Sequence, residues 1–122
     1  MAVKISEAEL EIMEILWRRS PLSAAEVAER VHGERDWSMQ TVKTLLSRLA
    51  AKSAVSHERD GRRFRYSPTV GRDDYVTEES RRLVDRLFGG RVSPLVAHLA
   101  KREDLSAKDI DEIEQLLKDL RS

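Results

Sequence analysis

The hydrophobic repeat of this chain changes from a helical to a strand period part-way along, and this change constrains the fold more than any other feature. In the first half, apolar residues recur every three or four positions, which is typical of amphipathic helices. Over residues 55–67 the period is two, and Phe64 and Tyr66 alternate with arginines. Asp60 and Gly61 lie inside this segment and predict a hairpin turn, because glycine adopts positive φ at little cost. An isolated hairpin is marginal in water, so we expect it to pack against the helices.

Three helices are expected before the hairpin, and each begins with a capping serine. The three serines are Ser6, Ser23 and Ser38. In the first two cases glutamate follows three residues later and completes a capping box. Pro21 ends the first helix near Ser20, Gly33 ends the second, and the third covers about residues 39–52. Three helices followed by a hairpin predict a winged helix-turn-helix domain over residues 1–71.

Three further amphipathic helices are expected after this domain, at about residues 74–88, from Ser93–Pro94 onward and after a cap at Ser106. Their apolar faces are too hydrophobic to lie in water, and the winged helix already has a core of its own. The simplest burial is against a second copy of the chain related by a twofold axis, so residues 72–122 are predicted to form a helical dimerisation region. The candidate contact residues are Val76, Leu83, Leu87, Phe88, Leu95, Leu99, Ile113, Leu116, Leu117 and Leu120. The expected fold class is mainly α with a small β-hairpin.

The composition limits the class of protein. At 122 residues the chain is long enough for one domain and an arm. It contains no cysteine, which excludes disulfides, thiolate metal sites and cysteine nucleophiles. No apolar run is long enough to span a bilayer, and residues 1–6 do not begin an export signal. We therefore expect a cytoplasmic protein with no membrane contact.

Catalytic and metal-binding motifs are not apparent in the sequence. His32, His57 and His98 lack the partner spacing of a metal site, so no metal is predicted. Serines and carboxylates are plentiful, but none lies in a nucleophile elbow, a glycine-rich phosphate loop or a metal-ligand motif. We expect neither an enzyme nor a cofactor.

Charge is distributed unevenly although the formal net charge is zero. Residues 38–71 contain seven basic and two acidic residues, whereas residues 72–122 contain ten basic and twelve acidic residues. Binding to nucleic acid is driven largely by lysine and arginine at the phosphates. A basic middle beside a mildly acidic tail therefore fits a protein that contacts a polyanion with one part only.

The third expected helix carries a polar face that lacks carboxylates. Its apolar residues share the opposite face on a helical wheel. The polar face consists of Gln40, Thr41, Lys43, Thr44, Ser47 and Arg48, next to the cap Ser38. Each of these side chains can donate a hydrogen bond to a phosphate or a base edge, and lysine, arginine and glutamine can recognise bases in the major groove. Together with Arg62, Arg63 and Arg65 of the hairpin, this face predicts binding to double-stranded DNA.

Other interpretations of the same residues exist. A polar helix face can simply be solvated, and the hairpin arginines can serve to prevent pairing with other strands at the edge. The same fold could also dock a protein partner without binding DNA. Steep salt dependence of DNA affinity would distinguish a DNA-binding domain from such a protein-interaction module.

Five segments of the chain, in order and at matching spacing, resemble the BlaI/MecI/CopY family of penicillinase-repressor winged-helix regulators. They are ISEAELEIMEILW (Ile5–Trp17), WSMQTVKTLLSRLAAK (Trp37–Lys52), GRRFRYSP (Gly61–Pro68), LFGGRVSPLVAHLAK (Leu87–Lys101) and DLSAKDIDEIEQLL (Asp104–Leu117). The resemblance implies a bacterial repressor that binds as a homodimer. In such a dimer the third helices enter successive major grooves of a palindromic operator, and the C-terminal helices hold the two copies together.

The resemblance also assigns roles to individual residues and marks two departures. It implies base or phosphate contacts for Lys43, Thr44 and Arg48, and phosphate contacts for the hairpin arginines. Copper-sensing members carry a cysteine-rich C-terminal motif, which this chain lacks. Members released by a sensor protease are cut at an Asn–Phe bond in the fifth helix, and His98–Leu99 stand at the matching positions here. Induction by that cleavage is therefore not expected.

Overall fold

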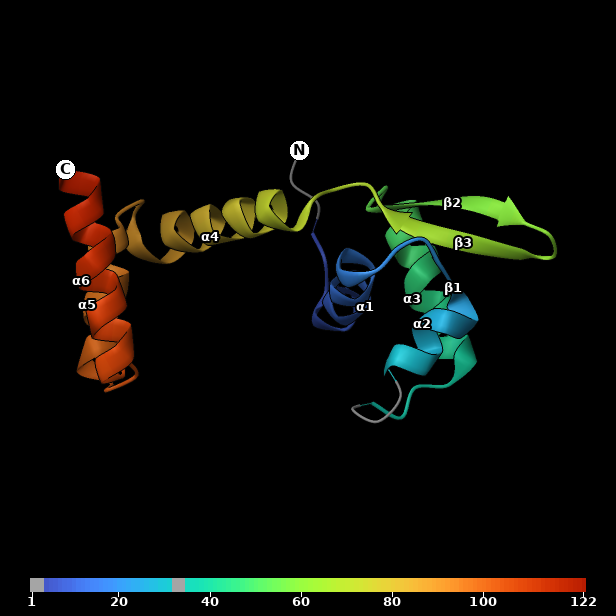
Figure 1. The fold of residues 1–122 in the computed structure, drawn as a ribbon, viewed down its shortest axis with the longest axis horizontal. Coiled ribbons are helices and arrows are strands. Elements are labelled where there is room, and N and C mark those ends of the chain that lie inside the picture. The colour runs from blue at the N-terminus through green and yellow to red at the C-terminus, as the bar shows by residue number, and fades with distance from the viewer. Residues whose placement is uncertain (1–3, 32–34) are drawn as a thin grey trace. The chain divides into compact units, whose positions relative to one another are not determined.

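The computed structural model describes residues 4–31 and 35–122 and divides into two compact units, Met1–Glu78 and Glu79–Ser122 (Figure 1). The elements of the first unit are α1 (Glu7–Arg18), β1 (Leu22–Ser23), α2 (Ala24–Val31), α3 (Met39–Ala51), β2 (Val55–Asp60) and β3 (Arg63–Pro68). The helix α4 (Arg72–Phe88) begins in the first unit and continues into the second, which also contains α5 (Val92–Lys101) and α6 (Ala107–Arg121). The expected class is confirmed: a mainly α chain with a winged helix-turn-helix unit followed by helices.

The predicted serine caps are present at the starts of the first three helices. Ser6 Oγ accepts a hydrogen bond from Glu9 N at 3.2 Å, and the Glu9 carboxylate accepts one from Ser6 N at 2.8 Å. Ser23 and Glu26 form the same reciprocal pair at 3.2 and 2.9 Å. Ser38 caps α3 through its bond from Thr41 N at 3.1 Å. The predicted stop at Gly33 lies outside the described residues, as does His32.

The core of the first unit lies between the three helices and the base of the hairpin. Its buried side chains are Ile12, Met13, Leu16, Leu22, Val27, Val31, Val42, Leu45, Leu46, Leu49, Ala54 and Val55. Four of them belong to α3 and share one face, so the polar side chains of this helix must point away from the core.

The hairpin belongs to a three-stranded antiparallel sheet of order β1-β3-β2. The two-residue strand β1, which the sequence pattern did not predict, pairs Leu22 with Tyr66. The predicted turn was wrong by one residue, because Asp60 pairs with Arg63 and the two loop residues are Gly61 and Arg62. Gly61 has a φ of 66°. A glycine with positive φ at the first loop position is typical of a type II′ turn, whose twist matches that of the strands.

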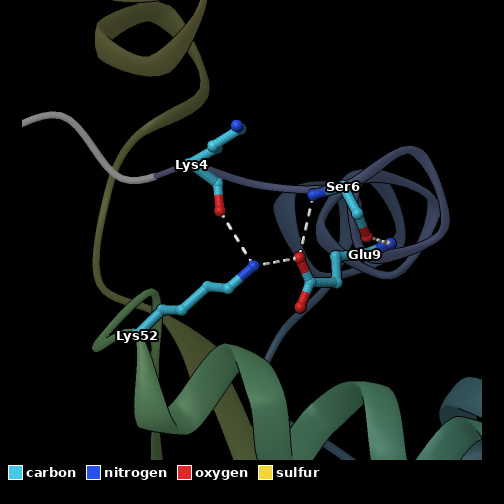
Figure 2. A network of polar contacts seen from close by, with 4 residues as sticks. All are labelled: Lys4, Ser6, Glu9 and Lys52. Carbon is cyan, nitrogen blue, oxygen red and sulfur yellow. Dashed lines mark hydrogen bonds and ion pairs between the residues drawn. The ribbon is translucent and has the colours of Figure 1, made fainter.

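Glu9 is buried and links the start of α1 to the end of α3 (Figure 2). Its Oε1 atom accepts hydrogen bonds from Ser6 N and from the ammonium of Lys52, which also donates to the Lys4 carbonyl at 2.9 Å. Its other oxygen, Oε2, is buried without a hydrogen-bond partner among the described residues. Burial raises the pKa of Glu9, but the bonds from Lys52 and Ser6 outweigh that effect, so the pKa lies below its usual value. The carboxylate is therefore held in its charged form by one cation and one helix cap.

Replacing Lys52 by methionine is expected to lower the free energy of unfolding by about 1–2 kcal/mol, because the buried carboxylate of Glu9 loses its cation. The loss is limited because Lys52 is half-exposed, so water screens the ion pair. Chemical denaturation of the full chain measures this change. Lys43→Met is the matched control, since Lys43 lies on α3, whose C-cap is Lys52, and forms no ion pair within the described ranges. A shift no larger than that of the control would contradict the role given to Lys52.

The helices of the C-terminal segment begin close to their expected positions, with one correction. Ser106 caps α6, as predicted, and it also forms a capping box with Asp109. The helix α5 does not start at a Ser93 cap: its N-cap is Arg91, which makes no capping bond with its side chain. Gly89 and Gly90 end α4 with φ of 59° and 84°, and Gly90 N donates to the Val84 carbonyl at 3.1 Å. Across residues 4–31 and 35–122, no helix is both long and apolar enough to cross a membrane.

Candidate nucleic-acid interface

The polar face of α3 is exposed, as its wheel position predicts. Gln40, Thr41, Lys43, Ser47 and Arg48 are exposed, and Thr44 is half-buried. The Ser38 and Thr41 hydroxyl oxygens lie 3.1 Å apart, so these two side chains are partly engaged in the helix cap. The remaining donors of this face point into solvent and are available to a ligand.

Three cations on this side of the first unit have no partner among the described residues. Among the residues that the structure describes, Lys43, Arg48 and Arg62 form no ion pair and no side-chain hydrogen bond. Exposed cations without partners keep their full charge available for a phosphate, because no internal carboxylate has to be displaced first.

A groove of about 430 Å³ lies between α3 and the hairpin. It is lined by residues 23–25 at the start of α2, by Met39, Lys43 and Ser47 of α3, and by residues 62–64 and Tyr66 of the hairpin. We call it the α3–hairpin groove. It combines two arginines and a lysine with exposed apolar surface from Met39 and Phe64.

The outer part of the hairpin projects beyond the helices (Figure 1). All residues of β2 after Val55 are exposed. Near the turn, the guanidinium of Arg59 lies 5.9 Å from the centre of the Phe64 ring, and Arg63 Nη2 lies 3.7 Å from Asp60 Oδ2. The projecting tip therefore presents arginines, with one carboxylate that partly neutralises them.

Arg65 lines a different hollow from the other two predicted hairpin arginines. It is half-buried, and its Nη2 donates to the Pro21 carbonyl at 3.2 Å. It lines a second, polar hollow of about 320 Å³ together with residues 56–60, whereas Arg62 and Arg63 line the α3–hairpin groove. Arg62 and Arg63 therefore line the α3–hairpin groove, whereas Arg65 lines the second hollow, where its Nε lies 3.9 Å from Asp60 Oδ2.

Glu26 is an acidic residue whose pKa is lowered by two of these arginines. Hydrogen bonds from the Ser23 backbone and hydroxyl hold the pKa of Glu26 below its usual value, and the charges of Arg63 and Arg65 lower it further. The carboxylate therefore stays ionised and committed to the α2 cap.

Sequence reasoning missed Met39, Phe64 and Arg59 as part of this surface. Met39 and Phe64 were passed over because large apolar residues are assigned to a core by default. Arg59 contributed only to the charge count. The available signal was their position, since Met39 lies at the edge of the apolar stripe of its helix, next to Lys43, and Phe64 faces Arg59 across the hairpin.

Two histidines among the described residues lie next to aromatic rings. His57 lies 4.9 Å from the centre of the Phe64 ring, and His98 lies 6.4 Å from that of Phe88. Within residues 4–31 and 35–122, no three histidine, aspartate or glutamate side chains are grouped so that they could hold a metal ion.

The predicted dimerisation residues are exposed or half-buried within one chain. Val76 belongs to the first unit and the other nine to the second. Leu116 and Leu120, one helical turn apart on α6, are 61% and 81% exposed. Neither α5 nor α6 contains a buried residue, so both helices leave apolar surface uncovered in the single chain.

Comparison with known proteins identifies the family. The sequence profile described as penicillinase repressor matches residues 5–119, which is nearly the whole chain. The chain belongs to the penicillinase repressor family. This family member is 33% identical over 116 residues to the penicillinase repressor of Bacillus licheniformis, covering 95% of this chain and 91% of that protein. It is 32% identical over 114 residues to the methicillin resistance regulatory protein MecI of Staphylococcus aureus (strain N315), covering 93% of each.

Two solved structures of the repressor BlaI match part of this chain. The solution structure of the DNA-binding domain of the repressor BlaI superposes with a TM-score of 0.56 at 37% identity, covering 62% of this chain and 92% of that domain. The Bacillus licheniformis BlaI monomer in complex with the blaP half-operator superposes with a TM-score of 0.51 at 39% identity, covering 59% of this chain and 88% of the other. Both matches support the winged-helix fold of this family member.

Proposed function

We propose that this member of the penicillinase repressor family is a sequence-specific transcriptional repressor that binds double-stranded operator DNA. The observation that carries the proposal is the α3 face without carboxylates, on which Lys43 and Arg48 form no ion pair with any residue that the structure describes. The relatives named above include a penicillinase repressor and a methicillin resistance regulatory protein, and BlaI is solved in complex with a half-operator. A repressor of this kind acts by occupying its operator in the cytoplasm and needs neither catalysis nor a cofactor.

In this proposal α3 is the recognition helix and lies in the major groove. Its donors Gln40, Lys43 and Arg48 point away from the core toward the bases, and Thr44 and Ser47 support them. The hairpin, as the wing, contacts the sugar-phosphate backbone through Arg62 and Arg63. Arg65 contributes mainly by holding the hairpin to the carbonyl of Pro21.

The proposed active form is a homodimer on a palindromic operator. Residues 1–71 bind DNA, and residues 72–122 provide the dimer contacts through the apolar residues that one chain leaves uncovered. Two recognition helices related by a twofold axis require an inverted repeat, with half-sites one or more helical turns apart. Release by cleavage at the family's Asn–Phe bond is not part of the proposal, because His98–Leu99 replace it.

Arg48→Ala is expected to weaken binding to a half-operator duplex by about 1–3 kcal/mol, because a guanidinium that pairs with a guanine is lost. The operator is first selected from random duplexes with the full chain, and affinities are then measured by mobility shift. Arg102→Ala is the matched control, since Arg102 is an exposed arginine of the second unit. Thermal unfolding verifies that both variants are folded.

Two outcomes would contradict parts of the proposal separately. Equal affinities for Arg48→Ala and Arg102→Ala would show that Arg48 does not contact the operator. Failure of the unmodified chain to retain any duplex from the random pool at low salt would overturn DNA binding itself and favour a protein-interaction module.

A further inference from the structure

Met39 is an exposed apolar residue at the first position of the proposed recognition helix. It is 40% exposed, and it is absent from the buried cluster of the first unit. Among the described residues of that unit, the exposed large apolar side chains are Met39, Phe64 and Val76, and the first two line the α3–hairpin groove. Exposed apolar surface is thus concentrated where the DNA is proposed to bind.

Met39 lies at the border between the polar face and the buried stripe of α3. The buried Val42 and Leu46 follow at three and seven residues, whereas Lys43 and Ser47 follow at four and eight and line the α3–hairpin groove together with Met39. In helix-turn-helix proteins, the N-terminal residues of the recognition helix are those that contact base edges. Met39 therefore occupies a base-contacting position without any group that could donate a hydrogen bond.

The major groove offers one apolar feature to such a side chain. All four bases present hydrogen-bonding groups there, but only thymine presents a methyl group, on its C5 atom. Methionine is unbranched and flexible, so it can adjust its terminal methyl group to a small apolar partner. Contact with a thymine methyl would cover surface that the free protein leaves in water.

We infer that Met39 is a specificity-determining residue that recognises the C5-methyl group of a thymine in each operator half-site. The inference rests on the proposed function and deepens it. Lys43 and Arg48 supply hydrogen bonds and charge, and Met39 supplies an apolar contact that selects thymine over cytosine and over uracil.

The test is a cycle that combines deletion of the methyl group with deletion of the side chain. In the selected operator, each thymine is replaced in turn by deoxyuridine at the symmetric positions of both half-sites. Affinities of the full chain are measured for the unmodified protein, Met39→Ala, Met39→Leu and Phe64→Ala. For the unmodified protein, one thymine position is expected to lose about fourfold in affinity per half-site on removal of its methyl group.

The variants decide which side chain senses that methyl group. Met39→Ala is expected to bind thymine and deoxyuridine operators equally at that position, whereas Met39→Leu and Phe64→Ala retain the discrimination. An unchanged uracil effect in Met39→Ala, its loss in Phe64→Ala instead, or no methyl-sensitive position at all would overturn the inference. Tight binding in these cases would leave the proposed function intact, so the two failures are distinguishable.

Discussion

Raising the salt concentration from about 50 to about 200 mM is expected to weaken operator binding by about 10³- to 10⁵-fold. The reason is the release of counterions from the phosphates that the protein neutralises. Lys43, Arg48, Arg62 and Arg63 are exposed on the proposed DNA-binding side of one protomer, and a dimer doubles that set. A titration of affinity against salt by fluorescence anisotropy gives the slope of log K against log salt, which is about −0.9 for each phosphate contact.

Single substitutions measure how much each residue contributes to that slope. Arg62→Gln is expected to reduce its magnitude by about 1 for each protomer and to weaken all duplex sequences alike, because a phosphate contact carries no base information. Arg121→Gln, an exposed arginine of α6, is the matched control and leaves the slope unchanged. A slope near zero for the unmodified protein would contradict phosphate contact by this surface.

The helix starts could be predicted wherever a side-chain cap marks them. Ser6, Ser23, Ser38 and Ser106 each form a hydrogen bond with a residue only three positions away, so the sequence contains both partners. The start of α5 was misplaced because Arg91 provides no side-chain bond there. A helix start with a side-chain cap can therefore be predicted from the sequence. A helix start without such a cap depends on contacts with the rest of the fold.

Strand β1 and the position of the hairpin turn depend on long-range contacts. Strand β1 is two residues long, which is too short to show a period of two in the sequence. Leu22 is a strand residue only because it pairs with Tyr66. The register of the hairpin places Val55 in the core and packs Tyr66 against it. This packing moves the turn to Gly61 and Arg62, one residue beyond the dipeptide that a local rule favours.

The polar face of α3 was predictable, but the groove beside it was not. The wheel alone separates Lys43 and Arg48 from the core, because four buried residues of α3 define the opposite side. Which hairpin residues face that helix depends on how the sheet lies against it. For this reason Arg65, adjacent in sequence to the groove-lining residues, lies elsewhere, and Met39 was overlooked.

Replacing Leu116 and Leu120 together by aspartate is expected to abolish dimerisation and to weaken binding to the full operator by about 10²- to 10⁴-fold, because two linked half-site contacts become independent. Both residues are mostly exposed in the single chain, so the substitution removes little packing within a protomer. In the proposed dimer, however, the two new aspartates of one protomer would be buried against the same two aspartates of its partner. Burying these charges has a high desolvation cost, which opposes dimerisation. Sedimentation velocity measures the oligomeric state, and mobility shift measures the affinity.

Affinity for a half-operator, measured for the same variants, distinguishes loss of dimerisation from damage to the α3–hairpin surface. The Leu116→Asp, Leu120→Asp double variant is expected to bind a half-operator as well as the unmodified chain does, since the first unit contains its own core and the whole α3–hairpin groove. Glu112→Asp with Glu114→Asp, on the same helix, is the matched control and preserves the dimer because it neither adds charge nor removes apolar surface. If the double leucine variant remained dimeric, α6 would not form the interface. If the unmodified chain were monomeric at micromolar concentration and still bound tightly to its operator, the apolar surface of α5 and α6 would serve a different contact.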